Sequence, residues 1–237
     1  MTNLLQYHLE NSIATLAMDD GKANVMSIHM LAAINAALDR ALADKAVVVL
    51  TGRAGMFSGG FDLNVFKTSP DESVQMLEAG ARLALRLLAH PQPVMAVCTG
   101  HAVAMGCFLL LGCDYRIGVD QGARIQAIEV QIGMTLPHFA LEVCRQRLTP
   151  AHFSLACNTA WPYTPAQAVA AGFLDEVAPA ASLPEVAKER AVYLSKLHAQ
   201  AFTATKLKLR QPVIAALHAA IDQDVIAWSK RSGAQGY

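Results

Sequence analysis

Apolar residues in the first half of the chain are spaced as in β-strands. Residues 4–9 and 12–18 alternate apolar and polar side chains on either side of Glu10 and Asn11, which is typical of two antiparallel strands joined by a short turn. Later runs are almost continuously apolar and rich in β-branched residues, a pattern that predicts buried strands. These further strands are expected at residues 46–51, 94–98 and 113–119.

Between these strands the apolar residues recur at helical spacing. Ser27 is a favourable N-cap for a helix that extends to about Ala43, with its apolar side including Leu38 and Leu42. Ser69 and Pro70 begin a second helix, expected to end near residue 89, before Pro91 and Pro93. Beyond residue 123 the chain is predicted to be mostly helical, around residues 128–133, 137–148, 150–157, 165–171, 183–197 and 200–232.

The order helix, strand, glycine-rich turn, helix occurs twice, about 46 residues apart, which indicates stacked turns of one spiral. The first glycine-rich turn follows Gly52 and the second follows Gly100. Glycine permits sharp turns, and the N–H groups that begin a helix have no partner within it. If the two turns meet, one N–H from each can bind the same oxygen, which would form an oxyanion hole.

Composition narrows the class of protein. The 237 residues are 54% hydrophobic and 16% charged, and 19 basic residues balance 19 acidic ones, so a nucleic-acid or membrane partner is not expected. The N-terminus resembles no secretory signal, which favours a cytoplasmic protein. No metal site is predicted, because the five cysteines are scattered without a paired motif, and buried reduced thiols are expected instead. His138, near a suspected site, is interpreted as a polar residue at a helix start.

Several segments together resemble the crotonase (enoyl-CoA hydratase/isomerase) superfamily, from about residue 4 to residue 230. Two are the glycine-rich turns 57–63 and 100–107, and 113–117 resembles the family's next strand. Ile128 to Gly133, with Pro137, is similar to the family's catalytic-glutamate segment, and 168–177 is similar to the family's later A-x-x-x-G-[LF]-[VL]-D stretch. The resemblance implies an α/β fold, a spiral of ββα turns with a helical C-terminal trimerisation region. Residues 1–180 would form the spiral core with the acyl-CoA site, and 181–237 a helical lobe of the same unit.

The resemblance also implies an acyl-CoA thioester substrate and no further cofactor, since coenzyme A is part of the substrate. By position, the oxyanion-hole donors are the backbone N–H groups of Phe61 and Met105, where the family usually has alanine and glycine. Because the apolar C-terminal helices need partners, a homotrimer or a dimer of trimers is expected. Residues expected to bind coenzyme A or substrate are Ser58, Gly59, Gly60, Asp62, Leu63, Asn64, Gly106 and Phe108.

Glu129 and Phe108 decide which reaction is expected. Hydratases of the family use two glutamates; Glu129 matches one, but Phe108 stands at the position of the other, and Asp114 is not an obvious substitute. One base is enough to move a double bond, so the pattern favours a Δ3,Δ2-enoyl-CoA isomerase with Glu129 as its catalytic residue. Three alternatives remain: a 2-enoyl-CoA hydratase, another crotonase-type reaction such as thioester hydrolysis, and an acyl-CoA-binding protein without activity. Without the resemblance, Glu129 would be interpreted as a carboxylate complementing a helix dipole.

Overall fold

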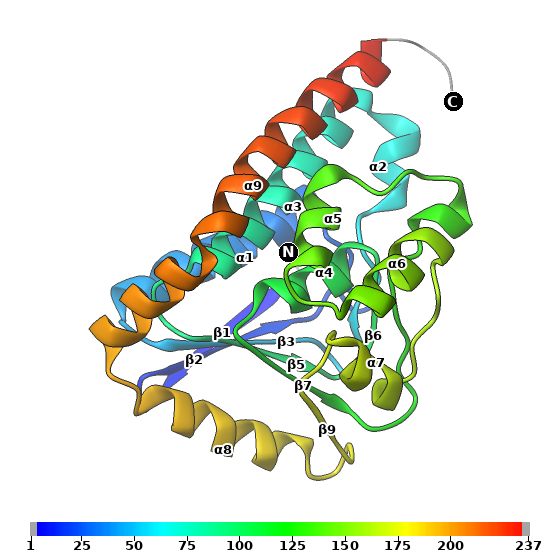
Figure 1. Ribbon diagram of the computed structural model, residues 1–237. Helices are drawn as coiled ribbons and strands as arrows, with labels where there is room; N and C mark the ends of the chain where they lie inside the picture. The colour runs from blue at the N-terminus through cyan, green and yellow to red at the C-terminus, as the bar shows by residue number, and fades with distance from the viewer. Residues whose placement is uncertain (1–3, 234–237) are drawn as a thin grey trace.

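A six-stranded sheet lies at the centre of the computed structural model, which describes residues 4–233 (Figure 1). The strand order is β1-β2-β3-β5-β7-β9; the β1–β2 pair is antiparallel and the other neighbouring pairs are parallel. The strands predicted before residue 120 are confirmed to within two residues at each end. Their bounds, with the unpredicted short strand β9, are β1 (Leu5–Glu10), β2 (Ile13–Met18), β3 (Val47–Thr51), β5 (Val94–Cys98), β7 (Tyr115–Val119) and β9 (Glu176–Ala178).

A second sheet forms, with two of its three strands in the segments predicted to be glycine-rich turns. It consists of β4 (Gly55–Ser58), β6 (Gly100–Val103) and β8 (Ile125–Gln126), in that order and all parallel. A Cβ added to Gly100 would lie 1.9 Å from the carbonyl carbon of Gly55, so this pairing requires glycine. The prediction of simple turns is therefore wrong, because pairing with a distant segment makes these residues extended.

The predicted helices are present, with small shifts at their ends. Ser27 accepts a hydrogen bond from the N–H of Met30, and Ser69 accepts one from the N–H of Glu72, so both act as N-caps. The helices are α1 (Ile28–Ala43), α2 (Leu63–Thr68), α3 (Pro70–Ala89), α4 (Met105–Gly112), α5 (His138–Arg145), α6 (Pro150–Thr159), α7 (Pro165–Ala171), α8 (Leu183–Ser195) and α9 (Ala199–Gly233). The segment expected to be helical at 128–133 is a 3₁₀ helix, η1 (Glu129–Ile132), and Leu42, expected on the buried side of α1, is 42% exposed.

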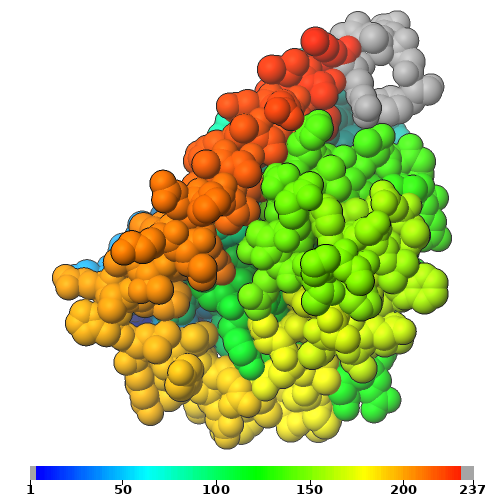
Figure 2. Space-filling view, viewed as in Figure 1, coloured from blue at the N-terminus to red at the C-terminus, as the bar shows by residue number. Residues whose placement is uncertain are grey.

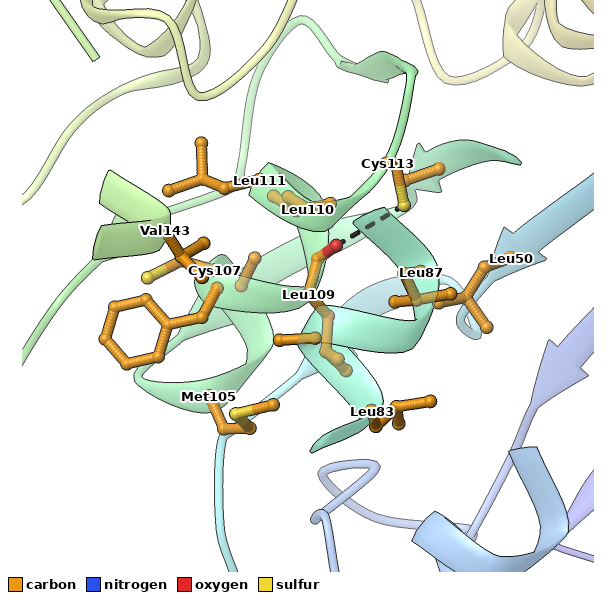
Figure 3. Close-up of a cluster of buried hydrophobic side chains, with 14 of the residues drawn as sticks. Leu50, Leu83, Leu87, Met105, Cys107, Leu109, Leu110, Leu111, Cys113 and Val143 are labelled. Carbon is orange, nitrogen blue, oxygen red and sulfur yellow. Dashed lines mark hydrogen bonds between the residues drawn. The ribbon is translucent and has the colours of Figure 1, made fainter. Parts of the chain in front are cut away.

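The two faces of the large sheet are covered differently. On one face, Val48 and Leu50 of β3 belong to the main core with α1, α3 and α4. On the other, Val49 packs in a smaller cluster with Leu183 and Ala187 of α8, the helix below the sheet in Figure 1. Helix α4 lies deep in the main core, with every side chain buried; Figure 3 shows its leucines against α3, β3 and α5. Packing contacts on every side therefore fix the position of α4.

Helix α9 runs along α3 and forms a continuous ridge, orange to red in Figure 2. Its buried Lys206 places Nζ 2.7 Å from the carboxylate of Asp114, and Arg210 lies 3.0 Å from the same carboxylate. Near its other end, Asp224 accepts hydrogen bonds from the N–H groups of His138 and Phe139, the first residues of α5. These contacts anchor α9 on its own chain. The predicted division into a core of residues 1–180 and a helical lobe of residues 181–237 stays a prediction.

All five cysteines are free and buried, as predicted: Cys98, Cys107, Cys113, Cys144 and Cys157. Between residues 4 and 233 there is no helix with the length and apolar character needed to cross a membrane. The same residues contain no group of three histidine, cysteine or acidic side chains that could hold a metal ion.

Candidate active site

The two glycine-rich turns meet. Gly60 has a φ of +95°, and a Cβ added to it would lie 2.7 Å from Cβ of Ala104 and 3.4 Å from the backbone nitrogen of Met105. A Cβ on Gly106 would lie 2.5 Å from the carbonyl oxygen of Ser58. Only glycine fits at both positions, because any side chain would force the two turns apart. This close approach places Phe61, directly after Gly60, beside Met105.

The backbone N–H groups of Phe61 and Met105 are free to bind a ligand. Met105 is the first residue of α4, so its N–H has no partner within the helix. Phe61 forms a bridge with Met26, but the hydrogen bond there runs from Met26 to Gly60. Within residues 4–233, neither N–H donates to another protein group. The two predicted oxyanion-hole donors are thus adjacent and unpaired.

A buried polar network that the sequence did not indicate holds the first turn in place. The Ser58 hydroxyl donates to the carbonyl oxygen of Asn24 at 2.8 Å and accepts from the N–H of Gly60 at 3.2 Å. The side-chain amide of Asn24 donates to the carbonyl oxygens of Met18 and Phe57. The only sequence signal for this network is the polar Asn24, which follows the turn-forming residues Asp19-Asp20-Gly21.

The residues predicted to bind coenzyme A or substrate fall into two groups. Ser58 is buried and its hydroxyl is used inside the turn, while Asp62 accepts from the N–H of Asn64 and caps α2. Leu63, 52% exposed, and Asn64 lie at the surface at the start of α2. Gly59, Gly60 and Gly106 belong to the junction of the turns, and Phe108 to the buried side of α4.

Glu129 has a buried carboxyl group, and one of its oxygens has no hydrogen-bond partner. It is 6% exposed, and its Oε2 atom has no hydrogen-bond partner. Burial raises the pKa of Glu129 to about 7, and a hydrogen bond from its own backbone N–H opposes this only partly. Burial, and to a lesser degree the charge of Glu129, raises the pKa of the Cys107 thiol in α4. A carboxyl group that titrates near neutral pH can both accept and return a proton.

Aromatic rings fill the space where a second acid would stand. Phe108, 1% exposed, meets Phe139 of α5 edge to face, with ring centroids 5.9 Å apart. Phe139 meets Trp228 of α9 at 6.5 Å. The carboxylate of Asp114 is occupied by Lys206 and Arg210, which is consistent with the expectation that it does not replace a catalytic glutamate.

Two other features lie apart from this chemistry. The side chain of His138 is exposed, and its backbone N–H begins α5, consistent with its interpretation as a helix-start residue. A cavity of about 350 Å³ lies on the opposite face of the large sheet, under α8, and is lined by residues such as Val49, Val97 and Ala187. Neither Glu129 nor the donor residues contribute to its lining.

Two free N–H donors and a buried carboxyl group with an unpaired oxygen are the parts needed to polarise a carbonyl group and to move a proton. Comparison with known proteins agrees: the family described as "Enoyl-CoA hydratase/isomerase" matches residues 8–232. The chain belongs to this family, within the crotonase superfamily. The resemblance inferred from the sequence and the predicted α/β fold are thereby confirmed.

Curated relatives include both enzyme types. The chain is 31% identical to a putative enoyl-CoA hydratase of Thermus thermophilus, over 84% of this chain and 78% of that protein. It is 25% identical to human mitochondrial enoyl-CoA delta isomerase 1, over 90% of this chain and 72% of that protein. The match to the rat enzyme of the same name, at 29% identity, spans 74% of this chain but 63% of that protein.

Solved structures give the same picture. An enoyl-CoA hydratase/isomerase family protein from Pseudomonas syringae is 44% identical, with a TM-score of 0.92, covering 94% of this chain and 96% of that chain. A structure from Mtb described as an enoyl-CoA isomerase is 41% identical, with a TM-score of 0.91, covering 96% and 99%. The fold and family are therefore shown, whereas isomerase and hydratase relatives are similarly close.

Proposed function

We propose that the chain is a Δ3,Δ2-enoyl-CoA isomerase that moves a double bond by transferring one proton. The observation that carries this proposal is the buried carboxyl group of Glu129, whose Oε2 is unpaired, with the ring of Phe108 at the position of a hydratase's second glutamate. An acyl-CoA thioester is the proposed substrate, and no additional cofactor takes part.

In the proposed reaction the thioester oxygen accepts hydrogen bonds from the N–H groups of Phe61 and Met105. Glu129, ionised, removes a proton from C2 of a 3-enoyl-CoA, and the electrons move into a dienolate that the two donors stabilise. The protonated Glu129 then delivers the proton to C4, leaving a 2-enoyl-CoA. Burial supports this role, because it keeps the pKa of the carboxyl group near 7 and limits proton exchange with water.

Hydration would require more than this site offers. A water molecule must be positioned and protons must be handled at two carbons, which a second carboxylate usually assists. Phe108 offers no hydrogen bond to such a water, and its packing against Phe139 leaves it 1% exposed. The runner-up, a 2-enoyl-CoA hydratase, is favoured by the 31% identity to the Thermus protein described as a putative hydratase.

Product identification separates the two reactions. Purified protein is incubated with 3-enoyl-CoA and, separately, with 2-enoyl-CoA of several chain lengths, and the products are resolved by chromatography. The proposal expects conversion of 3-enoyl- to 2-enoyl-CoA without accumulation of 3-hydroxyacyl-CoA. Rapid formation of 3-hydroxyacyl-CoA from 2-enoyl-CoA would instead identify a hydratase.

The proposed quaternary structure is a homotrimer or a dimer of trimers. Helix α9 supports it, because Leu207, Leu209 and Ile226 are large apolar residues that remain exposed on the single chain. Light scattering at micromolar concentration is expected to give three or six times the mass of one chain. A monomeric mass at that concentration would remove the proposal.

A further inference from the structure

Gly80 occupies an unusual place for a glycine. It is buried near the middle of the 20-residue helix α3, where glycine is less favourable than alanine. A Cβ added there would lie 2.5 Å from both Cε1 and Cζ of Phe61 and 3.5 Å from Cε of Met105. The missing side chain therefore leaves a notch in α3 that faces the side chains of both oxyanion-hole residues.

The Phe61 ring is seated in this notch by contacts on more than one side. Its tip rests against Gly80, and its centroid lies 6.4 Å from that of Phe66, with the rings at 88° in an edge-to-face arrangement. A contact of 2.5 Å between carbon atoms is far below van der Waals distance, so a methyl group on Gly80 would displace the ring.

Displacement of the ring would reach the backbone. Phe61 follows Gly60, which packs closely against Ala104, and Phe66 meets the Phe61 ring from another side. With the ring confined in this way, a shift of the Phe61 side chain moves the peptide that carries its N–H. Since Met105 on α4 is held by the surrounding core, the two donors would no longer converge.

We propose that Gly80 is a positioning residue for the oxyanion hole: its notch in α3 seats the Phe61 ring and so aims the Phe61 N–H at the thioester oxygen. This inference rests on the proposed function for its substrate class. It assigns Gly80 a role beyond helix packing, through a residue far away in the sequence. It follows that the loss of activity caused by a methyl group at Gly80 depends on the presence of the Phe61 ring.

The test is a double-mutant cycle of Gly80→Ala and Phe61→Ala. Loss of one oxyanion-hole donor costs about 10²–10³-fold in kcat, so Gly80→Ala, which misaligns a donor, is expected to lose about 10–100-fold in kcat with little change in KM. Adding Phe61→Ala to Gly80→Ala is expected to restore kcat to within about threefold of Phe61→Ala alone. Gln75→Ala, on the exposed side of the same helix, is the matched control and should match the wild type.

A binding measurement separates failure of this inference from failure of the proposed function. The absorption of cinnamoyl-CoA, a conjugated thioester, shifts to longer wavelength when its carbonyl accepts strong hydrogen bonds. The shift is expected with wild type, to be lost with Gly80→Ala and to return in the double variant. A wild type that gives the shift but isomerises no substrate would refute the proposed function while leaving Gly80 testable by the shift alone.

Circular dichroism and thermal unfolding establish that each variant is folded. If Gly80→Ala does not fold, the double variant must fold, since removal of the Phe61 ring relieves the clash. A folded Gly80→Ala with wild-type kcat and a wild-type spectral shift would overturn the proposal. So would equal loss in the single and double variants, because the effect would then not pass through Phe61.

Discussion

The two acidic side chains that flank α4 have opposite surroundings. Asp114, just beyond the C-terminal end of the helix, is satisfied by Lys206, Arg210 and the N–H of Val94. Glu129, at the start of η1, has no cationic partner among the side chains of residues 4–230, and its Oε2 accepts no hydrogen bond. Both groups are largely removed from water. The difference in their partners indicates that Asp114 holds α9 in place, while Glu129 remains available to accept a proton.

The largest expected effect is on turnover, from Glu129→Gln. The amide keeps the shape of the side chain but cannot transfer the proton, so isomerisation should fall about 10²–10⁴-fold while binding of acyl-CoA barely changes. Steady-state kinetics and titration with a saturated acyl-CoA measure the two quantities. Glu189→Gln, the same change at an exposed position of α8, is the control. A folded Glu129→Gln with wild-type turnover would remove Glu129 from the mechanism.

Asp114→Asn should act on stability instead. It leaves Lys206, 5% exposed, as a buried cation without its carboxylate partner, and loss of one member of such a pair costs about 3–5 kcal/mol. Chemical denaturation should report this loss, with turnover per folded molecule within about threefold of wild type. Adding Lys206→Met should recover part of the stability. No recovery would show that Lys206 is not the source of the loss.

The pH dependence of stability should distinguish the two acids next. Burial raises the pKa of Glu129 from 4.5 to about 7, so the folded state binds more protons than the unfolded state between these values. Wild-type stability should therefore decrease, relative to Glu129→Gln, as pH rises from about 4.5 to 7, and then level off. At 1.36 kcal/mol per pKa unit the total is about 3 kcal/mol. If the difference in unfolding free energy between the two proteins is the same at pH 4.5 and at pH 8, the pKa of Glu129 is not raised.

The smallest expected effect is a gain. Phe108→Glu places a second carboxylate near Glu129, so hydration of 2-enoyl-CoA should become measurable while isomerisation slows several-fold, because water enters the site. Phe108→Leu is the control for loss of the ring alone. Product analysis after a folding check measures both rates. Hydration equal in both variants would show that the gain comes from space and not from the acid.

Apolar spacing, caps and prolines were sufficient to predict most of the helices and the long strands. They failed for β4 and β6, whose glycine-rich sequences have little strand preference and become extended only through pairing between Gly55 and Gly100. They also missed β9, which has three residues and begins with Glu176. Short strands of this kind are decided by tertiary contacts.

In the candidate site, too, local patterns could be predicted from the sequence and tertiary contacts could not. The glycine-rich turns and the glutamate segment could be located from sequence, because each is a local pattern. The contacts of Gly80 with Phe61, and of Asp224 with the start of α5, join residues far apart in the chain and have no local signature. Whether Glu129 would be paired could also not be read from sequence, since η1, which carries it, packs against α6, a helix that begins more than fifteen residues later.

The five buried thiols can be used to measure local unfolding of the protein. Burial raises the pKa of Cys98 to about 12, and a thiol without ionisation or access to solvent reacts slowly with alkylating reagents. Alkylation rates at single cysteines would therefore follow how often each part of the chain exposes its interior. Burial also raises the pKa of Cys113 at the end of α4, which lies in a different element from Cys98 in β5. Mass spectrometry of alkylated peptides would rank those openings without any engineered cysteine.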